Sequence, residues 1–335
     1  MLQYVCITFS KLFKMSRGRV FLGTEEKPVS WKLLYWMLGL VVLLPLLNFL
    51  LGVHPPRFQT DDHPKRYGLD YEPVSFPTSD GLTLRGWFIP AASASLETAG
   101  KEEMAGNTCA TILVGHGYPF DKANILRHAL FLHPRFHLFV FDFRYFGESE
   151  GTYTTAGFLE TRDVQAAIDY VKSRGDVNPE RLGAMGFSMS ASAFILTRHP
   201  DVKAIVADSP YATLEGVIAR QFFFLPGFTK WPLVAITKFY ALIFLGVRVS
   251  DAAPADAVRD LNTPLLIIHG DADSQIPLEH SQTIYANANP DTTQFWIVPG
   301  GDHGFAHALE GPRYEVRVKE FFEQNLCTPT AQPSG

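Results

Sequence analysis

The apolar positions between about residues 70 and 325 form short continuous runs that alternate with longer amphipathic ones. In residues 156–174 the apolar side chains recur at helical spacing, and residues 121–133 and 189–199 are also predicted helices. The short apolar runs predict buried strands at 110–114, 137–143, 181–187, 202–209, 264–270 and 293–300. This alternation predicts an α/β fold with a mostly parallel sheet whose two faces are covered by helices.

The start of this region has a different pattern. Two strand-like runs, residues 71–78 and 82–90, flank Ser79-Asp80-Gly81, a turn sequence typical of a β-hairpin. We therefore expect an antiparallel pair at one edge of the sheet. Residues 91–108 are small and polar, which predicts a mobile loop.

A longer apolar run precedes the α/β region. Residues 33–53 carry no charge, and a helix of that length spans roughly the 30 Å hydrocarbon layer of a membrane. Trp31, Tyr35 and Trp36 lie at its start, where aromatic side chains favour a membrane interface. We therefore expect one transmembrane helix at residues 31–53. A cleaved signal peptide is the alternative, but the run exceeds the ~7–15 residues of a signal core and no A-x-A site follows.

Basic residues are more frequent before this anchor than after it, which predicts a cytoplasmic N-terminal segment (1–30) and a main domain on the opposite side of the membrane. The basic residues near the anchor are Lys14, Arg17, Arg19, Lys27 and Lys32 before it, and Arg57, Lys65 and Arg66 after it. Residues 54–69 are polar and rich in proline, so we expect a linker there. The main domain then covers residues 70–325, and residues 326–335 form a C-terminal tail.

The composition excludes several classes of protein. Hydrophobic residues make up 47% of the 335 residues, which is enough for a large core. The net charge of −5 argues against a nucleic-acid-binding protein, which carries a basic face. The three cysteines, Cys6, Cys109 and Cys327, lie far apart and form neither a C-x-x-C metal pair nor a disulfide framework.

Residues suited to nucleophilic catalysis follow three of the predicted strands. Ser188 lies in a turn between a strand and a helix, Asp273 follows the strand at 264–270, and His303 follows the last strand. A serine hydroxyl needs an adjacent base, and histidine suits that role because its pKa is near neutral. A carboxylate then fixes the tautomer of the histidine and stabilises its protonated form. Since function collects at the carboxyl ends of parallel strands, we expect these side chains to meet there.

Several motifs together resemble the α/β-hydrolase superfamily, within the serine hydrolases related to serine aminopeptidases and prolyl-oligopeptidase-type catalytic domains. The resemblance covers about residues 70–325 and implies an α/β-hydrolase fold. Its motifs are Gly115-His116-Gly117-Tyr118, the D-x-R-x-x-G-x-S sequence Asp142–Ser149, the Ser188 turn, the loop His269–Pro277, and Gly300-Gly301-Asp302-His303. The order Ser188, Asp273, His303 is the order in which this fold carries its catalytic triad.

Ser188 departs from the family pattern at one neighbour. The turn that presents the nucleophile has the pattern G-x-S-x-G, and Ser190 occupies the place of the last glycine. A sharp turn requires small neighbours, which Gly186 and Ala191 supply. The alternative interpretation is that Ser188 only caps the following helix.

The acid and the base also have alternatives. Asp271 and Asp208 are alternatives to Asp273, which the resemblance selects because it ends an H-G-x-x-D pattern. His307 is the alternative to His303 as the base. His116 is predicted instead to shape the turn before Tyr118.

The resemblance and the strand-to-helix geometry together predict an oxyanion hole formed by the backbone N–H groups of Tyr118 and Met189. Met189 begins a helix whose positive dipole end points at the site. The sequence contains no metal-ligand cluster and no phosphate-binding loop. The predicted mechanism is therefore acyl transfer without a cofactor or a metal.

An insertion at about residues 211–262 lies where this family often builds a lid over the site. It contains two apolar runs, 222–228 and 232–247. The second run includes Lys238 and is too short for a comfortable membrane span. We expect lid helices, which either pack on each other or contact the bilayer.

These features predict a membrane-anchored serine hydrolase that cleaves carboxylic esters with apolar acyl groups. The expected partners are a small-molecule or lipid-like ester and the membrane, but no nucleic acid. One alternative is a peptidase or amidase with the same triad. Another, from a different class, is a binding protein without catalysis. An epoxide hydrolase or dehalogenase is disfavoured because these relatives carry aspartate in the place of Ser188.

Overall fold

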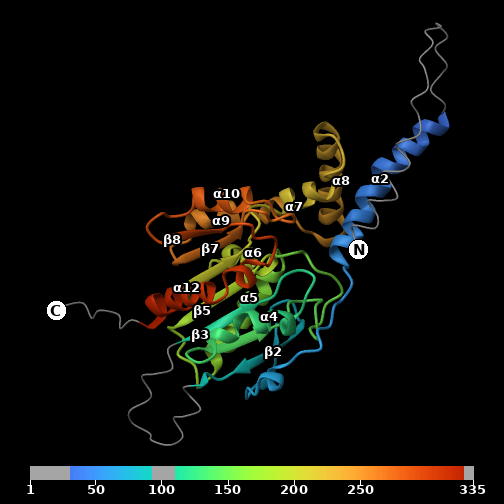
Figure 1. Cartoon of the computed structure of the whole chain (residues 1–335). Coiled ribbons are helices and arrows are strands. Elements are labelled where there is room, and N and C mark those ends of the chain that lie inside the picture. Colours follow the sequence, from blue (N-terminus) through green and yellow to red (C-terminus); the bar gives the residue numbers. More distant parts are fainter. Residues whose placement is uncertain (1–30, 93–109, 328–335) are drawn as a thin grey trace, which may run out of the picture. The chain divides into compact units, whose positions relative to one another are not determined.

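The computed structural model describes residues 31–92 and 110–327, and the chain divides into two compact units, Met1–Val41 and Val42–Gly335. The second unit contains an eight-stranded sheet flanked by helices (Figure 1). The strands are β1 (Glu72–Pro77), β2 (Thr83–Ile89), β3 (Thr111–Gly115), β4 (His137–Phe141), β5 (Leu182–Phe187), β6 (Val202–Asp208), β7 (Leu265–Gly270) and β8 (Thr293–Val298). Every strand that the sequence predicts is present.

The order of the strands in the sheet is β1-β2-β4-β3-β5-β6-β7-β8. The β1–β2 and β2–β4 pairs are antiparallel, and all the others are parallel. The prediction of a mostly parallel sheet with an antiparallel edge is therefore confirmed. Gly81, in the predicted hairpin turn, has a φ of 85°, a conformation that favours glycine.

Helices connect the parallel strands, as the amphipathic pattern predicts, and further helices precede β1 and follow β8 in the sequence. They are α2 (Trp31–Val53), α4 (Lys122–Ala129), α5 (Glu160–Ser173), α6 (Met189–Thr197), α7 (Leu214–Gln221), α8 (Gly227–Leu245), α9 (Pro254–Ala257), α10 (Glu279–Asn287), α11 (Ala306–Glu310) and α12 (Pro312–Phe322). Short 3₁₀ segments lie at Pro64–Tyr67, Leu130–Leu132, Val249–Asp251 and Val258–Asp260, and a π-helical turn lies at Glu323–Cys327.

Two apolar cores lie on the two faces of the sheet. The alternation of side chains along β3 sends Ile112 and Val114 into the core beneath α4 and α12, and Leu113 into the core beneath α5, α6 and α9. The strands of a parallel sheet are buried on both faces, and all five residues of β3 are buried accordingly. The loops that carry the predicted site follow the carboxyl ends of the central strands.

The predicted anchor forms a continuous helix, α2, but its membrane span is only weakly indicated. Among the described residues, its continuous apolar stretch Leu38–Val53 is shorter than a span requires. Among the described residues, α8 is the one helix long and apolar enough to cross a membrane by length and composition alone. The lid insertion thus contains a longer apolar helix than residues 232–247 predicted, because α8 begins at Gly227.

The segment predicted as a linker, residues 54–69, belongs to the second unit and contacts the loops around the sheet. Arg57 donates a hydrogen bond to the carbonyl of Gly151 (2.8 Å), and the N–H of Thr60 donates to Asp121 Oδ2 (2.6 Å). The Tyr145 hydroxyl donates to the carbonyl of Pro55 (2.6 Å).

Three other predicted segments lie at the limits of the described residues. The N-terminal segment 1–30, nearly all of the loop predicted at 91–108, and most of the tail 326–335 are outside them. Cys327, within the described part, is disulfide-bonded, which the spacing of the three cysteines did not predict.

The D-x-R-x-x-G-x-S motif that supports the family resemblance is a buried scaffold. Asp142 Oδ2 accepts a hydrogen bond from Lys122 Nζ (2.6 Å), and a Cβ at Gly147 would lie 2.3 Å from the Asp142 carboxylate. The Ser149 hydroxyl donates to the carbonyl of Asp142 (2.7 Å) and accepts from the N–H of Arg85 (2.9 Å). The motif therefore ties the loop after β4 to α4 and to β2.

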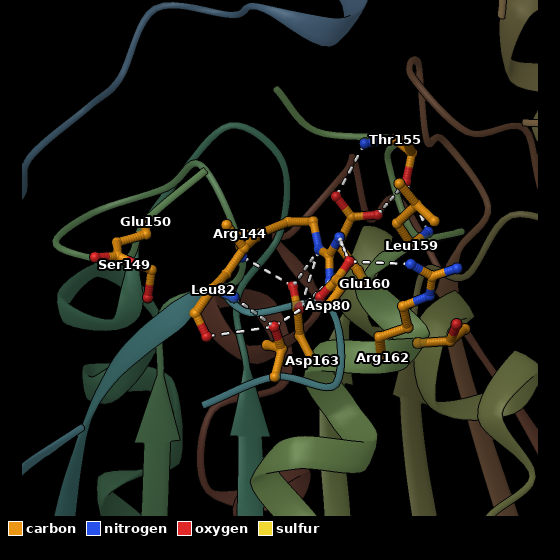
Figure 2. A network of polar contacts seen from close by, with 12 residues as sticks. Asp80, Leu82, Arg144, Ser149, Glu150, Thr155, Leu159, Glu160, Arg162 and Asp163 are labelled. Carbon is orange, nitrogen blue, oxygen red and sulfur yellow. Dashed lines mark hydrogen bonds and ion pairs between the residues drawn. The ribbon is translucent and has the colours of Figure 1, made fainter. Parts of the chain in front are cut away.

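Arg144, in the same motif, joins three separate parts of the chain (Figure 2). Its guanidinium contacts Asp163 Oδ1 in α5 (2.7 Å) and Asp80 Oδ2 in the β1–β2 turn (2.8 Å). Burial alone would lower the pKa of Arg144, but its hydrogen bonds to Asp163 and Asp80 raise that pKa above its ordinary value. The ion pair with Asp163 is buried, so the loss of Asp163 would leave the buried guanidinium with only the partly exposed Asp80 as a partner.

We predict that Asp163→Ala lowers the free energy of unfolding by about 3–5 kcal/mol, because it leaves Arg144 buried without its main partner. The control is Asp169→Ala on the same helix, at an exposed carboxylate that accepts from Gln165, with an expected change within about 0.5 kcal/mol. Denaturant-induced unfolding of the purified variants measures both values. Equal stability of the two variants would contradict the role of the buried pair.

Candidate active site

Ser188 lies between β5 and α6 in a strained backbone conformation. Its φ is 54° and its ψ is −110°, a region that residues with a side chain rarely adopt. Its N–H donates to the carbonyl of Asp208 on the neighbouring strand (2.8 Å). A Cβ at Gly186 would lie 2.5 Å from the backbone nitrogen of Ala191, so the turn requires glycine at that position.

Ser190 fits the turn without disturbing it. Its hydroxyl donates to the carbonyl of Gly115 on β3 (2.7 Å) and accepts from the N–H of Phe187 (2.8 Å). The departure from the family pattern therefore adds one hydrogen bond from the turn to β3 and one within the turn.

The structure brings together the three side chains predicted as a triad. Ser188 Oγ lies 3.0 Å from His303 Nε2, and His303 Nδ1 lies 2.7 Å from Asp273 Oδ2. The loops that carry these residues follow β5, β8 and β7, which end at the same edge of the sheet. Ser188 and Asp273 are both buried.

The Asp273 carboxylate is held from several sides. Its Oδ1 accepts from the backbone N–H groups of Gln275 (2.9 Å) and Ile276 (2.8 Å). Burial raises the pKa of Asp273, but hydrogen bonds from His269 and His303 outweigh burial and hold this pKa well below its ordinary value. The residue is therefore ionised at neutral pH, as a carboxylate that orients a histidine must be.

The alternative acids have other partners. Asp271 Oδ1 accepts from the N–H of Gly300 (2.6 Å) and so joins the two loops that follow β7 and β8. Asp208 accepts from the hydroxyls of Tyr314 (2.9 Å) and Ser209 (2.9 Å). Burial raises the pKa of Asp208 despite these hydrogen bonds. Neither carboxylate is hydrogen-bonded to His303.

The alternative histidines are also engaged elsewhere. His307 Nε2 contacts Glu315 Oε1 (3.0 Å). His116 is fully buried, its Nδ1 donates to the carbonyl of Gly117 (3.0 Å) and its Nε2 accepts from the N–H of Phe143 (3.1 Å). His116 thus links the turn before Tyr118 to the loop after β4, in line with the structural role predicted for it.

His269 also belongs to the site. It begins the motif His269–Pro277, but the sequence did not indicate its role. It is fully buried, its Nδ1 lies 2.6 Å from Ser281 Oγ, and its Nε2 lies 2.8 Å from the carbonyl of Ile276. Because a carbonyl only accepts, Nε2 carries the proton and Nδ1 accepts from Ser281. The same Nε2 lies 3.3 Å from Asp273 Oδ2, so His269 gives the carboxylate a second imidazole contact.

The predicted oxyanion residues lie next to the nucleophile turn. Met189 is the first residue of α6, and the N–H groups of the first turn have no partner within the helix. A Cβ at Gly117 would lie 2.5 Å from the ring of Phe187, so the turn that precedes Tyr118 approaches the Ser188 turn closely. Within the described residues, no group of three or more His, Cys, Asp or Glu side chains is arranged to hold a metal.

Comparison with known protein families shows which family the chain belongs to. The model of the prolyl oligopeptidase family matches residues 149–328, more than half of the chain. The chain belongs to the prolyl oligopeptidase family. The match includes the Ser188 turn and both loops that carry Asp273 and His303, and it confirms the resemblance inferred from the motifs.

Individual relatives agree with this assignment. An uncharacterised protein of Escherichia coli O157:H7, YfhR, is 33% identical over 250 residues, which cover 71% of this chain and 76% of the relative. The α/β hydrolase domain-containing protein WAV2 of Arabidopsis thaliana is 29% identical over 284 residues, which cover 81% of this chain and 85% of the relative. The esterase Pf2001 of Pyrococcus furiosus is structurally similar, with a TM-score of 0.64 and 25% identity, over 81% of this chain and 99% of the esterase. The chain is therefore a serine hydrolase with the α/β-hydrolase fold.

We predict that Ser281→Ala lowers kcat/KM on the order of tenfold, because it removes the hydrogen bond to His269 Nδ1 that holds this imidazole in place beside Asp273. With the His269 contact weakened, the pKa of Asp273 rises towards its ordinary value, so activity is lost at a higher pH on the acid side. The pH dependence of kcat/KM measures this shift.

The control for this experiment is Thr283→Val, also on α10, where the exposed hydroxyl donates only to the carbonyl of Glu279. Its pH profile should match that of the unmodified protein. A Ser281→Ala variant with the same profile as this control would show that His269 has no influence on Asp273.

Proposed function

We propose that the protein is a membrane-anchored serine hydrolase that cleaves carboxylic esters with apolar acyl groups through a Ser188–His303–Asp273 triad. The observation that carries this proposal is the continuous hydrogen-bonded chain from Ser188 Oγ to His303 Nε2 (3.0 Å) and from His303 Nδ1 to Asp273 Oδ2 (2.7 Å). Distances of this size allow proton transfer between a nucleophile and its base.

The geometry supports a two-step mechanism. Ser188 Oγ attacks the ester carbonyl while its proton moves to His303 Nε2, and a tetrahedral oxyanion forms. As the carbon–oxygen bond to the leaving alcohol breaks, His303 returns the proton to that alcohol and an acyl-Ser188 ester remains. A water molecule then gives a proton to His303 and attacks the acyl carbon; as the bond from that carbon to Ser188 Oγ breaks, His303 returns the proton to Oγ and the acid is released. Asp273 stabilises the protonated imidazole in both steps.

Backbone N–H groups stabilise the negative charge that develops on the carbonyl oxygen. The proposed donors are Met189, in the first turn of α6, and Tyr118, in the turn after β3. The dipole of α6 adds a positive potential at the same point. Removal of one such donor in other serine hydrolases costs on the order of 10²–10³ in rate.

The preference for an apolar acyl group rests on the side chains around the triad. An apolar cluster joins the ends of α2, α7 and α8 to the site through Tyr211 and Ile276. The N–H of Ile276 donates to Asp273 (2.8 Å), and the N–H of Tyr211 donates to Ser192 on α6 (2.9 Å). The cluster therefore adjoins the reacting groups. The similarity to an esterase over almost its whole length gives further support.

A peptidase or amidase is the second candidate, and the family assignment favours it. The same acyl-enzyme chemistry cleaves esters and amides, and the triad alone does not discriminate between them. Esters and amides differ in their leaving group, so a direct comparison of ester and amide substrates distinguishes an esterase from a peptidase.

Apolar exposed surface supports membrane attachment. In the Val42–Val53 part of α2, the exposed apolar side chains include Leu43, Leu47 and Leu51. On α8 they include Phe228, Trp231, Phe239, Ile243 and Phe244. We propose that α2 anchors the protein and that α8 contacts the same bilayer. The disulfide at Cys327 fits a hydrolase domain outside the reducing cytoplasm, opposite to a cytoplasmic N-terminal segment.

We predict that a fluorophosphonate probe labels the protein in a membrane fraction that has been washed with alkaline carbonate. Ser188→Ala should abolish labelling and reduce ester hydrolysis by about 10⁴–10⁶-fold, because the nucleophile is lost. The control is Ser192→Ala, a buried hydroxyl on the same helix, which should still be labelled. An unlabelled but folded wild-type protein would favour the binding protein without catalysis, and release by carbonate would contradict the anchor.

We predict that p-nitrophenyl esters of increasing acyl length are cleaved with kcat/KM values that rise with chain length, because the cluster beside the site favours apolar groups. Each added methylene buries area that contributes about 0.8 kcal/mol at most. Aminoacyl p-nitroanilides measured in the same assay give the comparison. Faster cleavage of the anilides than of any ester would assign the protein as a peptidase.

A further inference from the structure

The C-terminal end of α2 is capped by loops of the active site. A helix leaves its last four carbonyls without partners in the helix. In α2 the carbonyl of Leu50 accepts from the N–H of His54 (3.0 Å), the residue that follows the helix. The carbonyls of Leu51, Gly52 and Val53 are satisfied by Tyr118 and Thr154, both distant in the sequence.

Tyr118 connects this helix end to the proposed oxyanion hole. Its hydroxyl lies 3.2 Å from the carbonyl of Gly52 and 3.4 Å from that of Leu51. Burial raises the pKa of Tyr118 to about 12, so the hydroxyl keeps its proton and donates. The backbone N–H of the same residue is a proposed oxyanion donor. The helix end therefore restrains the residue that presents this donor.

Thr154 connects the helix end to the loop beside the second donor. Its N–H donates to the carbonyl of Val53 (3.0 Å). The loop is held by the buried carboxylate of Glu160, which accepts from the Thr154 hydroxyl (2.6 Å), the Thr155 N–H (2.9 Å) and the Gly157 N–H (2.8 Å). Figure 2 shows Glu160 beside Thr155. A Cβ at Gly157 would lie 3.4 Å from the carbonyl oxygen of Met189, so this loop packs directly on the start of α6.

Phe49 connects the same part of α2 to the lid insertion. Its side chain is buried, and its ring lies 6.2 Å from the ring of Tyr240 and 5.9 Å from that of Phe244 on α8. The Tyr240 hydroxyl donates to the carbonyl of Val42 (3.1 Å). These contacts fix α8 against α2 at two points.

We infer that residues Val42–Val53 of α2 are a positioning element of the active site as well as part of an anchor. Their terminal carbonyls hold the two loops that flank Ser188, and Phe49 holds the lid helix α8 beside the acyl side of the site. This inference rests on the proposed serine hydrolase function. It assigns to the helix an effect on turnover and substrate binding that an anchor joined by a flexible linker would not have.

Tyr118→Phe tests the link to the oxyanion hole in the full-length protein. The variant removes only the hydroxyl and keeps the backbone N–H, so kcat should fall about three- to tenfold while KM stays within about twofold. The control is Tyr170→Phe, which removes a hydroxyl that accepts from Arg174, far from the site. The control should leave kcat and KM unchanged.

Phe49→Ala tests the link to the lid. Loss of the ring opens a cavity between α2 and α8, so KM for a medium-chain p-nitrophenyl ester should rise about fivefold or more. Phe49→Leu should restore most of the affinity. Leu47→Ala is the matched control, because it removes an apolar side chain from the exposed face of the same helix, and it should leave KM unchanged.

The outcomes separate this inference from the proposed function. If wild type is labelled at Ser188 but Tyr118→Phe and Phe49→Ala both keep its kcat and KM, the helix has no positioning role and the inference is wrong. If wild type itself is not labelled, the proposed function fails first. If Phe49→Ala does not fold, Tyr118→Phe decides alone, since it removes only one hydroxyl.

Discussion

The Ser188 hydroxyl reaches His303 because the backbone of Ser188 adopts a conformation with positive φ that few residues with a side chain adopt. Such a conformation costs on the order of 1–3 kcal/mol, and it persists only where the surrounding structure determines it. Here the N–H of Ser188 is bonded to β6, and Gly186 leaves no space for a side chain. The rest of the site is arranged around the position that this turn gives to one oxygen atom.

Two layers of contacts surround the turn. In the inner layer, His303 and Asp273 complete the hydrogen-bonded chain, and His269 gives the same carboxylate oxygen a second contact. In the outer layer, the buried carboxylate of Glu160 holds the loop that packs on α6. Each layer contains ionised or polar groups with little access to water, and their hydrogen bonds to one another compensate for burial. The position of the nucleophile therefore depends on groups that lie well outside the triad.

Much of the fold and the three triad positions could be predicted from the sequence. The continuous apolar runs of a parallel sheet are easy to recognise, and Asp273 and His303 stand in motifs whose order the fold dictates. The partners that could not be predicted are those that depend on long-range register. Ser281, which orients His269, is an ordinary residue of α10, and only the packing of this helix against β7 reveals its role. The ion pair of Arg144 with Asp163 follows from the same kind of contact between distant elements.

The contacts of α2 are the clearest example of contacts that could not be predicted from the sequence. Its composition indicates an apolar helix, and the polar residues after it indicate a flexible linker. Composition carries no information on which loops satisfy the last carbonyls of a helix. Tyr118 and Thr154 satisfy them here, and Arg57 and Pro55 bring the following segment against the loop that carries Tyr145. Residues 54–69, which the composition predicts to be a flexible linker, are thus part of the folded unit.

Ser190 has a consequence for how this sequence can vary. A Cβ at Gly115 would lie 2.6 Å from the Cβ of Ser190, a separation that two side chains cannot share. Gly115 must therefore remain glycine for as long as position 190 carries a side chain, whereas with glycine at 190 only the ring of Phe143, at 3.1 Å, would remain close to a Cβ at 115. The two positions, 75 residues apart, are expected to change together in descendants of this protein, and an alanine introduced at 115 should be tolerated only after Ser190→Gly.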